Sequence, residues 1–424
     1  MNHTTKTFKH CFLRLNKHLL PSTTSSATLI KHSISTNSIL ITTLTFSPFI
    51  ISSLHTNQIT NSIPKPLHLP LPMSISTSSS EMEEVAAQVL VLCGKSNEED
   101  GIAESMINKR NVLKLPDLSP IHVCTLREIE KETTFRGIGI EEDAFQVKRY
   151  MGLLKTEAFG RFLLYSPRLS STQEVISHNF SELPLGAACV ADTQFKGKGR
   201  TNNVWESPKG CLMFSFTLQM ENGRILPFLQ YVISLAMVEA VKAVCQQNGI
   251  QNLDVKIKWP NDLYLDGRKV GGILCTSTYR SKRFNVSAGI GLNVGNEKPS
   301  ISLNSVVQRL HSPDQQLQRE DIMATFFNEF EKFYSIFRSQ GFQPFEELYC
   351  KTWLHSDQRV IVQDGETESI VTIQGITSEG YLLAIGDDGE RCQLHPDGNS
   401  YVTHCLSYAN SFDFFRGLVR RKLT

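Results

Sequence analysis

Helical periodicity is clearest in two long stretches of the chain. Between residues 225 and 249, apolar side chains recur three and four positions apart, which predicts a helix with a buried face. Gly249 suits the end of this helix, because glycine readily adopts the conformation that follows a last turn. A second helix is predicted over 320–340. Its aromatic residues repeat at helical spacing, which is typical of core packing: Phe326, Phe327, Phe330, Phe333, Tyr334 and Phe337.

Strand-like runs surround these two helices. Alternating or continuously apolar stretches that end in turn residues predict strands at 84–94, 121–126, 161–165, 186–192, 211–218, 255–259, 269–274 and 284–294. Asp266-Gly267 predicts a hairpin turn. From residue 357 onward the chain changes to short strands, at 359–362, 369–373 and 381–385, separated by Asp-Gly turns. These patterns predict an α+β core followed by a small β domain.

The N-terminal segment differs in composition from the rest of the chain. No acidic residue precedes Glu81, while Ser, Thr and Asn are abundant there. The segment contains these basic residues: Lys6, Lys9, Arg14, Lys17, Lys31 and Lys65. Such a composition is typical of an organelle transit peptide, and a disordered tail is the alternative. We therefore expect import into the chloroplast, the mitochondrion or both, with a cytosolic form if synthesis starts at Met73 or Met82.

Composition and charge argue against several functions. The 424 residues carry a net charge of +1, which does not suit a general nucleic-acid or membrane-surface binder. The ten cysteines form no CxxC pair and no Cys/His cluster, so we expect reduced thiols and no protein-bound metal centre. The apolar run at 38–54 is too short and too rich in Ser and Thr for a membrane span.

A glycine-rich basic loop is the first candidate for chemistry. It combines small, cationic and aromatic residues in one short stretch: Gln194, Lys196, Gly197, Lys198, Gly199, Arg200 and Trp205. Glycines let the backbone come close to a ligand, and cations beside backbone N–H groups bind phosphate or carboxylate. A solvated basic turn is the alternative that this loop by itself leaves open.

A second candidate stretch follows the predicted strand at 255–259. Asn261 and Asp262 come directly after Pro260, which ends the strand because proline has no N–H to donate. An amide and a carboxylate beside two lysines suit a catalytic edge, but Asn-Asp is also common turn chemistry, and the pattern leaves both open. Further along, Gly271 and Gly272 permit a close approach of the backbone. Gly289 and Gly291, at alternate positions, leave one face of a strand free of side chains, which suits a pocket wall for a planar or bicyclic ligand.

Two hydroxyl residues precede another helical pattern. Ser171 and Thr172 stand before an apolar-periodic run that reaches Ile176, which is typical of a helix N-cap. At a junction of strand and helix, the same hydroxyls could instead hydrogen-bond a polar ligand. Capping is the interpretation that the pattern by itself favours.

Together these stretches resemble the biotin–protein ligases, also called holocarboxylase synthetases, and most closely the plant members. The resemblance covers about residue 159 to the C-terminus. It is carried by Ser171-Thr172-Gln173, Gln194 with Gly197-Lys198-Gly199-Arg200 and Trp205, Lys258-Trp259-Pro260-Asn261-Asp262-Leu263, Lys269-Val270-Gly271-Gly272-Ile273 and Gly289-Ile290-Gly291-Leu292-Asn293. Asn203 stands where bacterial members usually carry a further loop arginine. No winged-helix pattern precedes the core, so a repressor role is not expected.

The resemblance implies an activity and roles for the motif residues. ATP would convert biotin into biotinyl-5′-AMP, with Mg²⁺ on the polyphosphate, and biotin would then pass to a carrier lysine. Lys269 and Arg200 would hold the carboxylate and phosphate, while Asp262 and Asn261 would act in the transfer. The other residues expected to bind biotin or ATP are Ser171, Thr172, Gln173, Gln194, Gly197, Lys198, Gly199, Trp205, Gly272, Gly289, Gly291 and Asn293. Ser171, Thr172 and Gln194 would read the ureido end, and Gly272, Gly289 and Gly291 would leave room for the rings.

The resemblance also implies an architecture and partners. The expected fold is α+β, with a central mixed β-sheet and helices as in class II aminoacyl-tRNA synthetases and biotin/lipoate ligases, and a C-terminal SH3-like β-barrel. We expect a transit segment at 1–80, a small α/β region at 81–150, the catalytic domain at 151–345 and the barrel domain at 346–424. Its partners would be biotin carboxyl carrier domains, such as that of acetyl-CoA carboxylase. A lipoate–protein ligase and a non-catalytic biotin-responsive regulator remain as alternatives.

Overall fold

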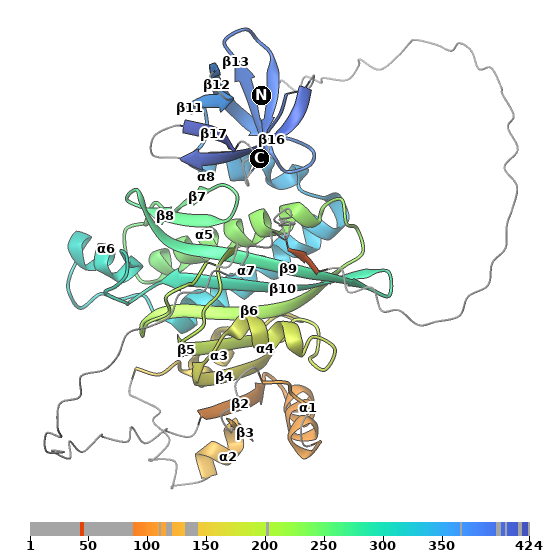
Figure 1. The fold of residues 1–424 in the computed structure, drawn as a ribbon. Helices are drawn as coiled ribbons and strands as arrows, with labels where there is room; N and C mark the ends of the chain where they lie inside the picture. Colours follow the sequence, from red (N-terminus) through yellow and green to blue (C-terminus); the bar gives the residue numbers. More distant parts are fainter. Residues whose placement is uncertain are drawn as a thin grey trace, which may run out of the picture. The chain divides into compact units, whose positions relative to one another are not determined.

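The computed structural model describes residues 43–45, 88–109, 112–115, 121–131, 143–200, 203–364, 367–395, 400–402, 405–413 and 418–422 (Figure 1). The predicted transit segment lies outside the described residues, apart from the short strand β1 (Thr43–Thr45), which pairs antiparallel with β9.

A ten-stranded mixed sheet organises the chain up to the C-terminal region. Its strands follow the order β3-β2-β4-β5-β6-β10-β9-β8-β7, and β1 joins β9 beside this path. The pairs β2–β3 and β4–β5 are parallel, and the other neighbours are antiparallel. The strands are β2 (Gln88–Gly94), β3 (Ile121–Thr125), β4 (Phe162–Leu169), β5 (Ala188–Gln194), β6 (Cys211–Met220), β7 (Lys256–Lys258), β8 (Asp262–Leu265), β9 (Arg268–Arg280) and β10 (Arg283–Asn293).

The helices cover both faces of this sheet. They are α1 (Asn97–Asn108), α2 (Leu126–Lys131), α3 (Val147–Leu153), α4 (Thr172–His178), α5 (Leu229–Gln247), α6 (Leu303–Leu310), α7 (Arg319–Gln340) and α8 (Glu346–Thr352), with 3-10 turns η3 (Leu226–Phe228) and η4 (Gln343–Phe345). The helix predicted at 225–249 is therefore split into η3 and α5, and both long predicted helices are confirmed.

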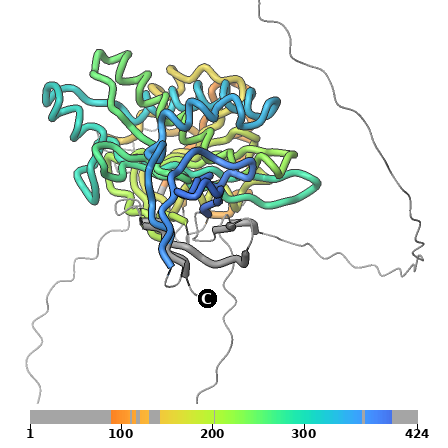
Figure 2. Tube along the Cα trace, turned by 90° about the horizontal axis from the view of Figure 1, so that it is seen from above, coloured from red at the N-terminus to blue at the C-terminus, as the bar shows by residue number. Residues whose placement is uncertain are grey.

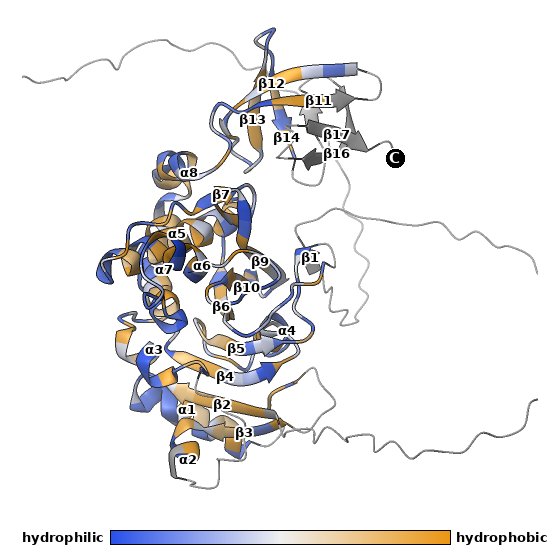
Figure 3. Ribbon diagram, turned by 90° about the vertical axis from the view of Figure 1, so that its left-hand side faces the viewer, coloured by the Kyte–Doolittle hydropathy of each residue, from blue (hydrophilic) through white to orange (hydrophobic). Residues whose placement is uncertain are grey.

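The aromatic stripe of α7 forms part of the core, as predicted. Phe326, Phe327 and Phe330 pack against Phe214 and Phe216 of β6, with ring centroids 5.1–5.9 Å apart. On the opposite side of the sheet, residues of α4 and α1 form a second apolar cluster with residues of β2 and β4. The apolar residues of β2 and β4 are orange in Figure 3. The sheet thus has a large core under α5 and α7, and a smaller one under α1 and α4.

One helix among the described residues, Leu226–Gln247, has the length and apolar composition of a membrane span. However, 78% of its most apolar window is buried inside the protein. Its apolar residues pack in the same core cluster as the aromatic residues of α7. Burial in the core therefore accounts for the composition of this helix.

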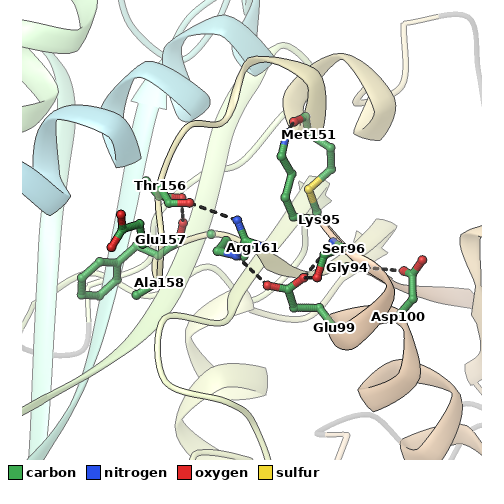
Figure 4. Close-up of polar contacts among 12 residues, drawn as sticks. Gly94, Lys95, Ser96, Glu99, Asp100, Met151, Thr156, Glu157, Ala158 and Arg161 are labelled. Atoms are coloured by element: carbon green, nitrogen blue, oxygen red, sulfur yellow. Dashed lines mark hydrogen bonds and ion pairs between the residues drawn. The ribbon is translucent and has the colours of Figure 1, made fainter.

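The first described strands join the same sheet. β2 pairs antiparallel with β4, and Arg161 at the start of β4 donates to Glu99 of α1 at 2.6 Å (Figure 4). Glu99 also accepts from the backbone N–H of Ser96, which begins α1 with a capping box. A Cβ at Gly94 would lie 2.4 Å from Glu99, so only glycine fits this turn. β2 is therefore part of the sheet, and α1 is held tightly beside it. The domain boundary near residue 150 remains a prediction.

The hairpin between β8 and β9 turns at Asp266 and Gly267, as predicted. Both residues have positive φ, 50° and 70°, as a tight hairpin turn requires. The next hairpin, between β9 and β10, extends beyond the neighbouring strands (Figure 2).

The C-terminal region forms a closed β-barrel. Its strands are β11 (Arg359–Asp364), β12 (Thr367–Ile376), β13 (Leu382–Gly386), β14 (Arg391–Leu394), β15 (Ser400–Val402), β16 (Cys405–Asp413) and β17 (Leu418–Lys422). Antiparallel pairing runs from β11 to β17, and a parallel pair between β11 and β17 closes the ring. The predicted α+β fold with a mixed sheet and a small C-terminal barrel is confirmed.

Candidate active site

The candidate motifs meet in one cavity. It has a volume of about 680 Å³ and is lined by residues from α4, the glycine-rich loop, and strands β8, β9 and β10. Every residue that the resemblance assigns to the site lines this cavity, with the exception of Gly197. The register explains the convergence, because β6, β10, β9 and β8 are consecutive antiparallel neighbours in the sheet.

The N-terminus of α4 presents unsatisfied polar atoms to the cavity. Ser171 occupies the N-cap position, but its hydroxyl makes no capping hydrogen bond and is buried without a partner among the described residues. The capping interpretation of this side chain is therefore wrong. The carbonyl oxygen of the Gln173 amide is also buried and unpaired, although the amide nitrogen donates to Ser287 O at 2.9 Å. Buried polar atoms without partners are rare, so both suit a polar ligand.

A hydrogen-bond network fixes Gln194 in the cavity wall. Its Oε1 accepts from the backbone N–H of Thr172 at 2.7 Å, and its Nε2 donates to Ser207 Oγ at 3.0 Å. The hydroxyl of Thr172 lies 2.9 Å from Ser215 Oγ of β6. Gln194 therefore holds the start of the glycine-rich loop against α4. Ser215 was not predicted for the site, because the residues next to it in β6 are apolar.

The glycines of β10 accommodate protein side chains. A Cβ at Gly289 would lie 2.6 Å from Gln173 Oε1, and a Cβ at Gly291 would lie 2.7 Å from the indole nitrogen of Trp205. The space beside Gly289 and Gly291 is thus filled by Gln173 and Trp205. Gly272 differs, because a Cβ there would make only ordinary contacts of 3.4 Å or more. All three glycines line the cavity, and room for ligand rings beside them stays a prediction.

The glycine-rich loop is a small closed hairpin. Trp205 N donates to Gly197 O at 2.9 Å, and Gly199 N donates to Asn203 O at 2.7 Å. A Cβ at Gly197 would lie 2.4 Å from Trp205 O, so this glycine serves the packing of the loop and does not line the cavity. An ion pair between Lys198 and Glu174 of α4 joins the loop to the helix.

The three loop cations have different positions. Arg200 and Lys198 line the cavity, whereas Lys196 does not. The Lys196 ammonium lies 5.6 Å from the ring centroid of Phe195, which is 41% exposed. Two of the three cations of the predicted anion-binding loop therefore lie at the cavity.

Asn261 connects the glycine-rich loop to the sheet. Its Oδ1 accepts from Arg200 Nη1 at 2.9 Å, and its Nδ2 donates to Ile273 O at 2.7 Å. The backbone of Asn261 also accepts from Ile273 N at 2.9 Å. This amide is buried, and these bonds aim Arg200 at the cavity.

Lys269 and Asp262 form the central ion pair of the cavity. Lys269 Nζ lies 2.7 Å from Asp262 Oδ1, and 5.4 Å from the ring centroid of Trp205. A register shift between Leu263 and Tyr264 interrupts the pairing of β8 with β9 between the positions of Asp262 and Lys269. The side chains of Lys269 and Asp262 are 40% and 23% exposed, so a ligand and a second reactant can reach both.

Residues distant in sequence hold the loop that carries Asn261 and Asp262. The indole nitrogen of Trp259 donates to Tyr231 OH at 2.8 Å and lies 3.3 Å from Gly380 O of the barrel domain. His355 Nε2 accepts from the backbone N–H of Trp259 at 3.1 Å. Burial lowers the pKa of His355 to about 4, so its imidazole is neutral and can accept this bond.

Further cavity residues escaped sequence reasoning. They are Asn203, Val204, Glu206, Ser215, Ile273, Leu274, Ile290, Pro299 and Ser300. Ile273 and Ile290 belong to motifs already quoted, and Leu274 directly follows one of them. Pro299 and Ser300 follow β10 without a recognisable signal. Among the described residues, no group of three or more His, Cys, Asp or Glu is positioned to hold a metal ion. The cavity thus combines three cations, Lys198, Arg200 and Lys269, with unpaired polar atoms, and suits a ligand that has an anionic end and a polar neutral end.

Two protein-family models match parts of this chain. The "Biotin/lipoate A/B protein ligase family" matches residues 165–293, and the "Biotin protein ligase C terminal domain" matches residues 355–400. The first match contains the glycine-rich loop and the ion pair of the cavity.

Curated relatives extend the similarity to most of the chain. Biotin–protein ligase 1, chloroplastic, of Arabidopsis thaliana is 55% identical over 363 residues, which cover 85% of this chain and 94% of that protein. Biotin–protein ligase 2 of the same plant is 54% identical over 81% of this chain and 100% of that protein. Among solved structures, the biotin protein ligase from Aquifex aeolicus in complex with biotin and ATP has a TM-score of 0.44 at 24% identity, and covers 55% of this chain and 94% of that one.

Proposed function

This chain belongs to the biotin–protein ligase family, and we propose that it forms biotinyl-5′-AMP from biotin and ATP and then transfers biotin to a lysine of a carrier protein. The observation that carries the proposal is the Lys269–Asp262 ion pair in a cavity beside Arg200 and the glycine-rich loop. The same cavity combines the cations that an acyl phosphate needs with a carboxylate that can act on an incoming amine.

In the first step, an oxygen of the biotin carboxylate attacks the α-phosphorus of ATP, and pyrophosphate leaves. Two anions must meet for this bond to form, so fixed cations lower the barrier. Lys269 would bind both the carboxylate and the α-phosphate, and Arg200 would bind the phosphate from the opposite wall. Asn261 supports this role, because its amide already orients Arg200 before any ligand is present. Mg²⁺ would enter as part of the Mg·ATP substrate.

The neutral end of the cavity suits the ureido group of biotin. Ser171 Oγ and Gln173 Oε1 are the buried atoms without partners there, and an N–H of the ureido group could donate to either. Thr172 and Gln194 are already paired with each other, so they would shape the wall and hold the loop. Trp205 would contribute the flat surface at the junction between the two ends.

In the second step, an amine of the carrier attacks the acyl carbon of biotinyl-AMP, AMP leaves, and the amine loses a proton. Asp262 is the candidate that orients this lysine and accepts the proton. The ion pair of Asp262 with Lys269 supports this order of the two steps. Because Lys269 holds Asp262 at 2.7 Å, a biotin carboxylate that binds Lys269 would displace Asp262 and free it for the second substrate.

Water would hydrolyse the mixed anhydride, so the site must exclude it between the steps. The loop between Gly197 and Trp205 borders the cavity, and among the described residues it is joined to α4 through Lys198–Glu174 and the Gln194 network. We propose that it closes over the adenylate, which restricts water access and retains the intermediate.

The acceptors would be biotin carboxyl carrier domains of carboxylases, such as acetyl-CoA carboxylase. The basic, acid-free N-terminal segment and the chloroplastic relative support import into the chloroplast. Mitochondrial import, and a cytosolic form that starts at Met73 or Met82, belong to the same proposal.

Biotin-dependent ATP–pyrophosphate exchange by the purified chain tests this function. The assay would supply biotin and lipoate separately, and would then measure transfer to a carrier domain. Exchange with biotin only is expected. Exchange with lipoate only would move the protein to the lipoate ligases, and biotin binding without exchange would favour a biotin-responsive regulator.

A further inference from the structure

An aromatic side chain flanked by two cations lies next to the cavity and has no role in it. Phe195 follows directly after β5 and is 41% exposed. Arg168 lies 5.4 Å from the centroid of its ring, and Lys196 lies 5.6 Å from it, so both are within cation–π range. We call these three residues the Phe195 patch.

The backbone of this patch is fixed by the sheet. Arg168 of β4 pairs in register with Thr193 of β5, and Phe195 N donates to Leu169 O at 3.2 Å. Lys196 N donates to Ser170 O at 2.9 Å, which continues the pairing past the end of the strands. An exposed aromatic on such a preorganised backbone loses little entropy when a partner covers it.

The patch is outside the small-molecule site but adjacent to it. None of its three residues lines the cavity, whereas Gln194 and Lys198, which flank Phe195 and Lys196 in the chain, both do. Arg168 also forms no ion pair with a carboxylate among the described residues. An exposed surface that carries an aromatic anchor and cations outside the cavity suits a macromolecular substrate more than a small one.

We propose that the Phe195 patch is the docking surface for the carrier domain, and that it binds an acidic surface next to the acceptor lysine. This inference rests on the proposed function. A lysine side chain is short, so a folded carrier must rest on the rim of the cavity for its ammonium to reach Asp262. The Phe195 patch supplies positive charge and an apolar contact next in the chain to the cavity residues Gln194 and Lys198, and carboxylates beside the lysine would complement it.

Charge reversal in the patch separates docking from adenylation. Arg168→Glu and Lys196→Glu would be compared with Arg224→Glu, which makes the same charge change at an exposed position just beyond the opposite end of β6. Phe195→Ser removes the aromatic contact. Each variant would be assayed for biotin-dependent ATP–pyrophosphate exchange, which needs no carrier, and for transfer from preformed biotinyl-AMP to a purified biotin carboxyl carrier domain.

The patch variants should raise the KM for the carrier about tenfold, while exchange stays within about twofold of the unmodified protein. Added salt should raise the carrier KM of the unmodified protein more than that of Arg168→Glu, because salt screens exposed charges. Arg224→Glu should change neither reaction.

Three results would overturn the proposal. The carrier KM could remain unchanged in the patch variants, it could rise equally in Arg224→Glu, or exchange could fall in parallel with transfer. The last result would instead assign Phe195 to the movement of the glycine-rich loop. Failure of the proposed function has a different signature, since the unmodified protein would then show no biotin-dependent exchange.

Discussion

His355 accepts a hydrogen bond from the backbone N–H of Trp259 at 3.1 Å, although the two residues are 96 positions apart. His355 precedes the first strand of the barrel, and Trp259 precedes the turn that carries Asn261 and Asp262. Leu354 N also donates to Ile257 O at 2.9 Å, which adds a second contact between the same segments. The segment before the barrel therefore contacts the stretch that leads to Asn261 and Asp262 through both a side chain and the backbone.

This contact predicts a pH-dependent stability. The folded state holds the pKa of His355 at about 4, below its ordinary value of 6.5, because the imidazole is buried. Between these values the unfolded state binds the proton and the folded state does not, so the free energy of unfolding should fall as the pH decreases. The lowered pKa of His355 contributes about 3 kcal/mol to the free energy of unfolding. This contribution is fully present above pH 6.5 and is lost as the pH falls to about 4.

His355→Gln should therefore reduce the stability at neutral pH and flatten its decrease over this acid range. Urea unfolding followed at several pH values would measure both effects. His178→Gln, at an exposed position on α4, is the matched control and should keep the original pH dependence. His395 is partly exposed and contributes equally in all three proteins. A parallel shift of the whole curve in His355→Gln would contradict the prediction.

Lys269→Ala should abolish most of the first half-reaction. The variant removes the ammonium that pairs with Asp262 and that would bind the biotin carboxylate and the α-phosphate. Removing one such electrostatic contact typically costs about 100- to 1,000-fold in rate. ATP–pyrophosphate exchange with biotin measures the effect, and Arg268→Ala, at the exposed neighbouring position, serves as control. Retention of normal exchange in Lys269→Ala would remove the role proposed for this lysine.

Asp262→Asn should affect the second half-reaction more than the first. The amide oxygen of asparagine can still accept from Lys269, so adenylation should fall by no more than about tenfold, whereas the loss of the base should slow transfer about 100-fold or more. Single-turnover transfer from preformed biotinyl-AMP, compared with exchange, resolves the two effects. The expected deficit in transfer should shrink as the pH rises, since more of the acceptor lysine is then neutral. Equal losses in both steps would assign Asp262 to the positioning of Lys269 alone.

Two glycine substitutions should damage the two ends of the cavity separately. In Gly289→Ala the new methyl group would lie 2.6 Å from Gln173 Oε1, so Gln173 must move and the KM for biotin should rise. In Gly291→Ala the methyl group would lie 2.7 Å from the Trp205 indole, so the wall formed by Trp205 must shift. Overpacking of this kind costs about 1–3 kcal/mol.

Gly375→Ala is the matched control for these two variants. No atom lies within 4 Å of the Cβ that it would add in the barrel, so it should leave biotin binding and exchange unchanged. Equilibrium binding of biotin and exchange kinetics would be measured for all three variants. Unaltered biotin affinity in Gly289→Ala would show that Gln173 can move without cost.

The amino-acid sequence by itself determined the two long helices, most of the strands and the order of the motifs. The periodicity of 225–249 and 320–340, the Asp266-Gly267 turn and the apolar strands depend on neighbouring residues, so local physics was sufficient to predict them. The spacing of five short motifs was specific enough to indicate the family before any distance was known.

Only the tertiary structure decided how the side chains share the cavity. The packing of α4 and of the glycine-rich loop against β10 brings Gly289 next to Gln173, and Gly291 next to Trp205, over separations that no local pattern encodes. The buried, unpaired hydroxyl of Ser171 and the outward position of Lys196 depend likewise on neighbours from other strands. Local sequence limits which backbone conformations are accessible, but the burial and pairing of each polar atom are set by residues that approach only when the chain is folded.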